Sequence, residues 1–458
     1  MHDCLILITA FQGGMERTPS CRRHRSGCAG EVCCAFMDPA AKHNSPPARA
    51  GFIALLTTMS CGAINDNLLR GGLLLSVAAG GMWGGELGEG GTGWITVMLY
   101  LPFILLLGVT GQLADRRSKR SIIVWTRIAE VFLAAGVTAG LWMQSMWVTS
   151  GFFILLAAQS AFFSPAKYGS VPDLVAVERL AWANGLLSLL TNIAIILGMA
   201  VAGYLLGIGP VILGLTMIGV AVIGLLSSLA IPKIPPADPE LQLSFRTFTA
   251  HTRVLSRIRG TPLMNTTLAW CWFYAVGSLV ITIIPQFRGL LELTDTAAGA
   301  MLAAPGLGIG IGGLVAGFVS RDGIRAGLVP IGALGMTVSF VLLAVVPSTW
   351  LRVIILLAVL GVFAGFYVVP ILAMLQHMPV PSFRARTVGT ANFMTYLAMG
   401  GSALAFAVLA PVIGNEPQMW FWICAGGMLL VFISSVRQRS IMGEGAAMGA
   451  FSSIEGDG

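Results

Sequence analysis

Charged side chains are scarce in this chain, and their scarcity excludes most soluble folds. Only 10% of the 458 residues are Asp, Glu, Lys or Arg, whereas 56% are hydrophobic and the mean hydropathy is +0.84. A typical soluble domain carries about 25% charged residues. A chain with so little charge and so much apolar surface must lie in a bilayer. It leaves no room for a soluble catalytic or cofactor-binding domain.

Catalytic and metal-binding signatures are also missing. The sequence contains no G-x-x-x-x-G-K-[ST] nucleotide loop, and none of its five His is followed four residues later by Asp, the usual acyltransferase pair. Cys21, Cys28, Cys33 and Cys34 lie close together but do not form two clean CxxC units. We therefore expect no catalytic residues, no cofactor, no metal and no direct use of ATP.

Long apolar runs dominate what is present, and they predict an all-α membrane protein. A membrane helix needs about 20 largely apolar residues, and twelve runs meet this requirement. They lie near 51–80, 93–114, 121–143, 148–168, 183–207, 209–231, 263–287, 297–319, 327–347, 350–373, 388–412 and 417–436.

The net charge of +7 comes from bases in short loops and does not indicate a nucleic-acid partner. The loops after the second, fourth, sixth, eighth and tenth runs hold fifteen Lys and Arg, whereas the opposite loops hold only Arg288 and Arg352. Basic loops of membrane proteins face the cytoplasm. This asymmetry predicts that both termini are cytoplasmic.

One long interior break divides the runs. Residues 233–261 begin K-I-P-P-A-D-P-E after Pro232 and continue as a basic stretch. We expect this break to be a cytoplasmic linker between an N-terminal half, 51–232, and a C-terminal half, 262–437. Weak echoes between the two sets of six runs predict pseudo-symmetric halves.

The two ends of the chain are polar. Residues 1–50 read as a leader and 438–458 as a cytoplasmic tail. Met37 begins a plausible short leader, M-D-P-A-A-K-H-N-S-P-P-A-R, so our hypothesis is that residues 1–36 are not native. A peptide from residues 16–36, found by mass spectrometry of the native protein, would contradict it.

Residues 111–120 read G-Q-L-A-D-R-R-S-K-R and join the second run to the third. The pattern resembles the loop between helices 2 and 3 of the major facilitator superfamily, except that Ser118 stands where that family usually has Gly. The resemblance implies two six-helix halves that rock about a midplane cavity, giving alternating access. We expect Asp115, Arg116 and Arg120 to latch one state on the cytoplasmic side.

The first run carries a polar patch, N-D-N at 65–67 followed by Arg70. Charge inside a membrane is costly and is a functional hypothesis by default. Asp66 and Arg70 are four residues apart and share a helix face, so they form either a self-neutralising ion pair or a patch that faces the central cavity. Arg127 and Glu130 form a second close pair, for which we expect a structural or gating role.

Further polar residues gather at the end of the fourth run and in the fifth. Residues 164–169 read S-P-A-K-Y-G, Asn184 opens the fifth run, and Asn192 lies two turns deeper on the same face. Lys167 is either a plain positive-inside residue or a phosphate ligand. A lipid-facing stripe would not contain the two asparagines.

A more specific resemblance lies in this block. S-A-F-F-S-P-A-K-Y-G-S-V-P-D-L, followed by A-N-G-L, is similar to the bacterial lysophospholipid transporters and to the transporter half of fused acyl-carrier-protein synthetase and acyltransferase proteins. The N-D-N at 65–67 matches their helix 1 signature, although the transporter branch often has Gly at position 65. Residues 364–370 and Leu375-Gln376 match a second block. The likeness runs from about 55 to 435.

The resemblance implies a flippase of the bacterial inner membrane. Such proteins move lysophospholipids, notably the ethanolamine type, toward the cytoplasmic leaflet, where a separate acyltransferase or acyl-carrier-protein synthetase restores the missing chain. In this chain Arg70 or Lys167 would pair with the phosphate, Asp66 with the ammonium, and asparagines with the glycerol hydroxyl. The expected substrate site consists of Asp66, Asn67, Arg70, Lys167, Tyr168, Asn184, Asn192 and Gln376.

Three other functions compete with this one. A proton-coupled exporter of amphipathic drugs fits the 111–120 loop equally well, although the block at 160–174 argues against it. A non-transporting scaffold for a lipid acyltransferase has no reason to bury Asp66 and Arg70, and a membrane enzyme lacks the catalytic pairs. Proton coupling through Asp66 is the weaker expectation, because an adjacent Arg70 favours the ionised carboxylate.

Overall fold

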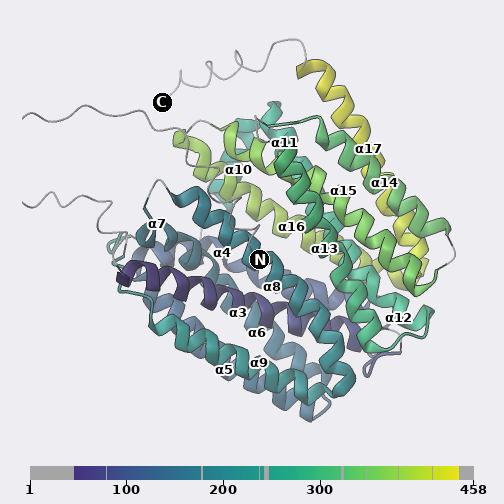
Figure 1. Ribbon diagram of the computed structural model, residues 1–458, viewed down its shortest axis with the longest axis horizontal. Helices are drawn as coiled ribbons and strands as arrows, with labels where there is room; N and C mark the ends of the chain where they lie inside the picture. The colour runs from purple at the N-terminus through teal and green to yellow at the C-terminus, as the bar shows by residue number, and fades with distance from the viewer. Residues whose placement is uncertain are drawn as a thin grey trace, which may run out of the picture. The chain divides into compact units, whose positions relative to one another are not determined.

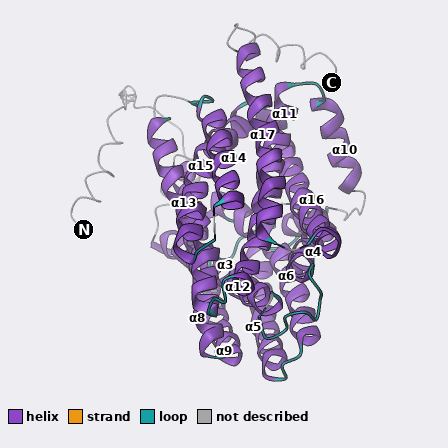
Figure 2. Cartoon of the chain, turned by 90° about the vertical axis from the view of Figure 1, so that its right-hand side faces the viewer, coloured by secondary structure: helices purple, strands orange, loops and turns teal. Residues whose placement is uncertain are grey.

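The computed structural model describes residues 46–442, apart from 79, 177–178, 237, 242–246, 321–323, 347, 380 and 415. Within these residues the regular structure is entirely helical (Figure 2). Twelve helices are long and apolar enough to cross a membrane, which confirms the predicted fold class of a multi-pass, all-α membrane protein. The leader to residue 45 and the tail from 443 lie outside the described residues.

The twelve spanning helices follow the predicted runs closely (Figure 1). Each run was predicted from apolar length alone, which is the property that fixes a membrane helix. The helices are α3 (Pro46–Val77), α4 (Gly91–Arg116), α5 (Lys119–Trp142), α6 (Met146–Gly169), α8 (Leu180–Ile208), α9 (Pro210–Leu229), α11 (Pro262–Ile283), α13 (Asp295–Val319), α14 (Leu328–Val345), α15 (Trp350–His377), α16 (Pro381–Ile413) and α17 (Pro417–Met442).

Four short elements were not expected: α7 (Val171–Leu174), α10 (Thr247–Ile258), η2 (Ile284–Gln286) and α12 (Phe287–Leu290). They are too short or too polar for a search based on apolar length. Only α10 falls within the predicted linker.

The linker helix α10 docks on α16. The His251 ring stacks on Phe393 at 4.5 Å between centroids, and its Nδ1 lies 3.1 Å from the Thr390 hydroxyl. Burial lowers the pKa of His251, which favours the neutral ring in this contact. The linker is therefore held against the C-terminal helices by a specific contact.

The spanning helices contact one another in two sets. Helix α3 packs on α8 and α9, and α5 packs on α6 and α9; in the second set α13 and α14 pack on α15, and α11 packs on α16. One hydrophobic cluster fills the second set, and others fill the first. The domain boundaries at 51–232, 233–261 and 262–437 stay a prediction.

The two sets meet where α8 packs on α13 and α4 packs on α16. A Cβ atom on Gly203 would lie 2.2 Å from the Asp295 carbonyl, and one on Gly93 would lie 2.7 Å from the Ala407 nitrogen. Both glycines therefore permit a backbone contact that a side chain would prevent. Gly93 lies near the start of α4, and Gly203 lies near the end of α8. Both contacts therefore lie at the helix ends opposite the linker.

Hydroxyl and amide groups join the same ends. Thr96 and Thr282 place their hydroxyl oxygens 3.1 Å apart, and the Gln286 side-chain amide donates to the Thr92 hydroxyl at 3.0 Å. We call the Gly93, Gly203 and Thr96 contacts together the outer seal. At the helix ends that carry the 111–120 loop, the ion pair found among the described residues, Lys119 with Asp173, lies within the first set.

Candidate functional site

The Asp66 carboxylate is bound by a neighbouring helix. The Ser160 hydroxyl of α6 lies 3.0 and 2.8 Å from its two oxygens, in hydrogen-bond contact. Ser160 is buried and Asp66 is partly buried. The charged groups that act on Asp66 are Glu130, Arg127 and Lys167. The structure thus holds a carboxylate inside the membrane with one direct side-chain donor.

Arg70 lies beside an aromatic ring. Its guanidinium carbon lies 5.4 Å from the centre of the Tyr100 ring, and the three ion pairs among the described residues include neither Asp66 nor Arg70. The described residues thus contain no self-neutralising Asp66–Arg70 pair, and the alternative, a polar patch that faces the central cavity, stays a prediction.

The guanidinium of Arg70 is left with unmet hydrogen-bonding capacity. Its Nε and one Nη are buried and have no hydrogen-bond acceptor. A buried donor without a partner costs about 1–3 kcal/mol, and more when it is charged. An anionic ligand that bonds these nitrogens would recover that cost.

Gln159 adds a second unpartnered donor in this region. It precedes Ser160 on α6, is buried, and its side-chain nitrogen has no hydrogen-bond partner. We did not predict Gln159 as a site residue, because a Gln in a long apolar run is often bonded within its own helix. The site next to Asp66 thus contains donors that await an acceptor.

An aromatic wall crosses between the two sets of helices beside this patch. Phe103 of α4 stacks on Tyr396 of α16 at 4.8 Å, and Tyr100 lies 6.3 Å from the same ring. Tyr396 also interacts electrostatically with Asp66 and Tyr168. None of the three rings of the wall was predicted. They come from two apolar runs far apart in the sequence, and no local sequence pattern indicates that these runs contact each other.

Arg127 and Glu130 form the second predicted pair, and this pair is confirmed as an ion pair. Both side chains are at most 2% exposed. Asn65 donates to Glu130 at 2.9 Å and to the Met217 carbonyl at 3.1 Å, while the Arg127 guanidinium covers the Phe163 ring at 3.9 Å. Asn65 therefore belongs to a buried polar core, although it adjoins Asp66 in sequence.

The remaining predicted residues are dispersed. Asn67 donates to the Ala63 carbonyl of its own helix at 2.8 Å. Lys167 lies 4.8 Å from the Tyr168 ring centre. Tyr168, Asn184 and Asn192 are exposed, and the side chain of Gln376 lies outside the described residues.

The 111–120 loop carries the three residues of the expected latch. Asp115 and Arg116 are exposed, and Arg120 donates to the Leu229 carbonyl at 3.1 Å. The ion pair of this loop joins Lys119 to Asp173 at 2.7 Å. In this conformation, none of the ion pairs found in the described ranges includes a residue of the expected latch.

Comparison with known proteins gives consistent matches. The profile of the Major Facilitator Superfamily matches residues 50–321. The chain is 28% identical over 360 residues to the lysophospholipid transporter LplT of Serratia proteamaculans, covering 74% of this chain and 83% of that protein. It is 30% identical over 324 residues to the lysophospholipid transporter LplT of Salmonella arizonae, covering 68% and 75%.

Two solved structures share the fold. One is a bacterial homologue of the human lysosomal transporter Spinster, inward-facing and unoccupied, with a TM-score of 0.62, 15% identity and coverage of 87% of this chain and 95% of that chain. The other is a mutant of the peptide transporter POT in complex with sulfate, with a TM-score of 0.66, 12% identity and coverage of 84% and 94%. At these identities the likeness shows the fold alone.

Proposed function

Because this chain belongs to the major facilitator superfamily and, within it, to the lysophospholipid transporter family, we propose that it moves lysophospholipids across the bacterial inner membrane toward the cytoplasmic leaflet. One observation on this chain supports the proposal independently of its family. The Arg70 guanidinium, buried in a membrane helix, has two nitrogens without an acceptor. A lipid phosphate has the charge and the oxygens to bond both.

The ends of the site match the ends of a zwitterionic headgroup. Arg70 binds the phosphate, and Asp66, held by Ser160, binds the ammonium of an ethanolamine group. The unpartnered amide of Gln159 donates to the glycerol hydroxyl that remains where one chain is absent. Asp66 and Arg70 form no ion pair with each other among the described residues, so each charge can meet one end of such a headgroup.

The other predicted residues have supporting roles in this proposal. Lys167 acts electrostatically on Asp66 and lies near the Tyr168 ring. It attracts the phosphate to the mouth of the site. Asn67, Asn184 and Asn192 are further proposed substrate-binding residues, and the aromatic wall holds the start of the acyl tail. A separate acyltransferase or acyl-carrier-protein synthetase then consumes the imported lipid.

Alternating access explains the contrast between the two helix ends. The outer seal closes the end opposite the linker, whereas at the other end Asp115, Arg116 and Arg120 take part in none of the ion pairs between described residues. We infer an inward-facing state, in which the cytoplasmic latch has opened. In the outward-facing state these charged residues close and the outer seal separates.

Gly203→Leu tests the outer seal. The leucine would overlap the Asp295 backbone, and overpacking of about 1–3 kcal/mol should lower transport about tenfold or more. In a background without the eight cysteines of the sequence, a Thr282→Cys reporter should react faster with a membrane-impermeant maleimide added outside.

Gly151→Leu is the matched control for this experiment. No atom lies within 4 Å of a Cβ added to Gly151, so transport and labelling should stay unchanged. Equal labelling of the Gly203→Leu and Gly151→Leu variants would contradict the proposal that the contact at Gly203 keeps the outer seal closed.

Reconstituted vesicles test the substrate site. We expect the purified protein to move labelled lysophosphatidylethanolamine out of reach of external albumin. Arg70→Gln should slow this movement about tenfold or more, since a charge-assisted bond is worth about 1.5–3 kcal/mol. Arg253→Gln, an exposed linker change, should not. Equal rates for Arg70→Gln and wild type would remove Arg70 from the site.

The same vesicles separate lipid transport from drug export. Proton coupling through Asp66 is tested separately, because Arg70 forms no ion pair with this carboxylate among the described residues. Lipid movement with and without an imposed proton gradient decides whether coupling exists. Export of an amphipathic cation driven by the gradient, without lipid movement, would favour the drug exporter.

A further inference from the structure

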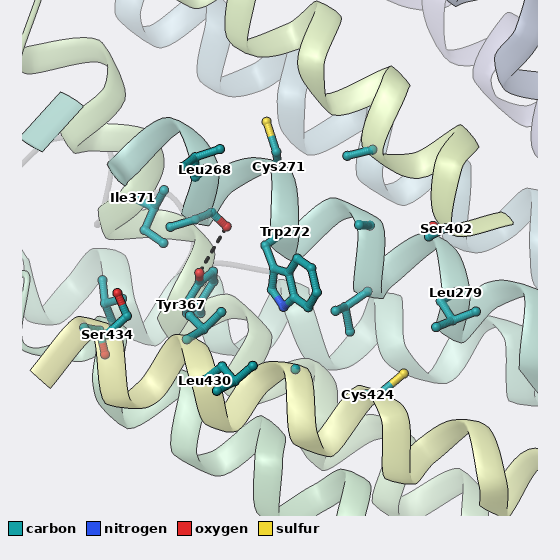
Figure 3. Close-up of a pocket in the computed structure, with 18 of the residues that line it drawn as sticks. Leu268, Cys271, Trp272, Leu279, Tyr367, Ile371, Ser402, Cys424, Leu430 and Ser434 are labelled. Carbon is teal, nitrogen blue, oxygen red and sulfur yellow. Dashed lines mark hydrogen bonds between the residues drawn. The ribbon is translucent and has the colours of Figure 1, made fainter. Parts of the chain in front are cut away.

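A strongly apolar cavity lies within the C-terminal set of helices. Its volume is about 1030 Å³. Figure 3 shows Trp272 between Leu268 and Leu279 on α11, opposite Leu430 and Cys424 on α17. The described lining residues include none of the proposed substrate residues. We call this cavity the lateral groove.

Three hydroxyl groups that line the lateral groove are bonded within the protein. The Tyr367 hydroxyl donates to the Ala269 carbonyl at 3.1 Å, the dashed line in Figure 3. Ser402 and Ser435 donate to backbone carbonyls at 2.9 and 2.8 Å. Since these groups need no ligand, the groove presents an apolar surface to any occupant.

The lateral groove faces the bilayer. Several large lining side chains lie in membrane-spanning segments and are nonetheless exposed: Leu268, Trp272, Leu409, Ile423 and Leu430. Hydrocarbon, and not water, surrounds such a surface. An unfilled groove would forfeit dispersion contacts along its walls.

The length of the groove fits a lipid chain. Its lining on α11 runs from Asn265 to Leu279, about 21 Å at the rise of an α-helix. One leaflet contributes about half of a hydrocarbon core that is roughly 30 Å thick. The groove therefore accommodates an acyl chain over the full depth of a leaflet.

Basic residues flank the linker end of the groove. Arg325 precedes the lining residue Ala326, and Arg437 follows the lining residue Ser435 by two positions. Both arginines are exposed, and neither takes part in the ion pairs found in the described part of the chain. Their charge complements a phosphate at the membrane surface.

We propose that the lateral groove binds one acyl chain of a resident diacyl phospholipid, whose phosphate lies near Arg325 and Arg437. This lipid is distinct from the transported one, because the groove is separate from Asp66 and Arg70. It fills the space between α11 and α17 and holds α17 against the rest of the C-terminal helices.

Native mass spectrometry of the purified full chain tests this proposal. The wild type should retain one diacyl phospholipid. Ala405→Trp places an indole in the groove, and occupancy should fall about tenfold or more because it displaces several methylene groups. Leu314→Trp, on the exposed face of α13, is the matched control and should keep the lipid. Arg325→Gln with Arg437→Gln should also weaken retention.

A second variant distinguishes the loss of lipid binding from misfolding of the protein. Leu430→Gln keeps nearly the same volume at a side chain that is 69% exposed, and it places an amide in the apolar wall. It should lose the lipid as Ala405→Trp does. Full retention by either folded groove variant would overturn the proposal. A single-chain lipid as the sole retained species would overturn it too, because it would assign the groove to the substrate tail.

Discussion

Asp66→Asn should lower uptake of labelled lysophosphatidylethanolamine by about 10–100-fold at equal expression. The substitution keeps the shape of the side chain and its contact with Ser160 but removes the charge that pairs with the ammonium. A charge-assisted bond is worth about 1.5–3 kcal/mol, and each 1.4 kcal/mol corresponds to tenfold. Uptake by bacterial spheroplasts that lack their own transporter measures the effect.

Two further variants make this result specific. Glu89→Gln removes an acid from an exposed loop and should leave uptake unchanged. Ser160→Ala leaves the carboxylate charged but unsupported, so its loss of uptake should be smaller than that of Asp66→Asn. Uptake that Asp66→Asn does not alter would keep the function and discard the site.

Arg127→Met should destabilise the folded protein by about 3–5 kcal/mol. Glu130 would lose its ion pair while remaining buried, with only Asn65 as a partner. Breaking one side of a buried pair leaves an uncompensated charge, which costs far more than the pair contributes. Equilibrium unfolding in mixed detergents measures the change in the free energy of unfolding.

The double variant separates charge from packing. Arg127→Met with Glu130→Gln removes both charges and keeps a side-chain oxygen for the Asn65 amide. We expect it to recover most of the stability lost in Arg127→Met. A loss below about 1 kcal/mol in the single variant would show that Glu130 is not a stranded charge.

The spanning helices were predictable because a bilayer permits few alternatives. A spanning segment must satisfy its own backbone and be about 20 residues long, so the run at 350–373 sufficed to place α15 (Trp350–His377). The linker helix α10 was missed since it is amphipathic and short. Its position depends on a His251 contact with Phe393, 142 positions later in the sequence, that no local pattern contains.

The sequence identified individual residues of the candidate site but did not predict how they contact one another. The cost of intramembrane charge identified Asp66 and Arg70, but helix spacing left open whether they form an ion pair, and their contacts with Ser160 and Tyr100 come from the fold. Ser160 lies 94 positions from Asp66, and the Tyr100 and Tyr396 rings come from different halves. These contacts between helices depend on helix packing, which cannot be predicted from any single apolar run.

The latch illustrates the same limit. The single acid among bases at 111–120 predicted a latch of one conformational state, but it gave no indication that Lys119 pairs with Asp173 of α7. The unexpected helix α7 supplies the acid. Asp115 then remains available for the other conformational state that we propose.

The most direct test of the account is uptake of labelled lysophosphatidylethanolamine by spheroplasts that lack their own transporter and express this chain. We predict uptake well above that of cells with an empty vector, and competition by unlabelled lysophospholipid but not by diacyl phospholipid. No uptake from a well-expressed, membrane-inserted chain would contradict the lysophospholipid transporter and favour the drug exporter.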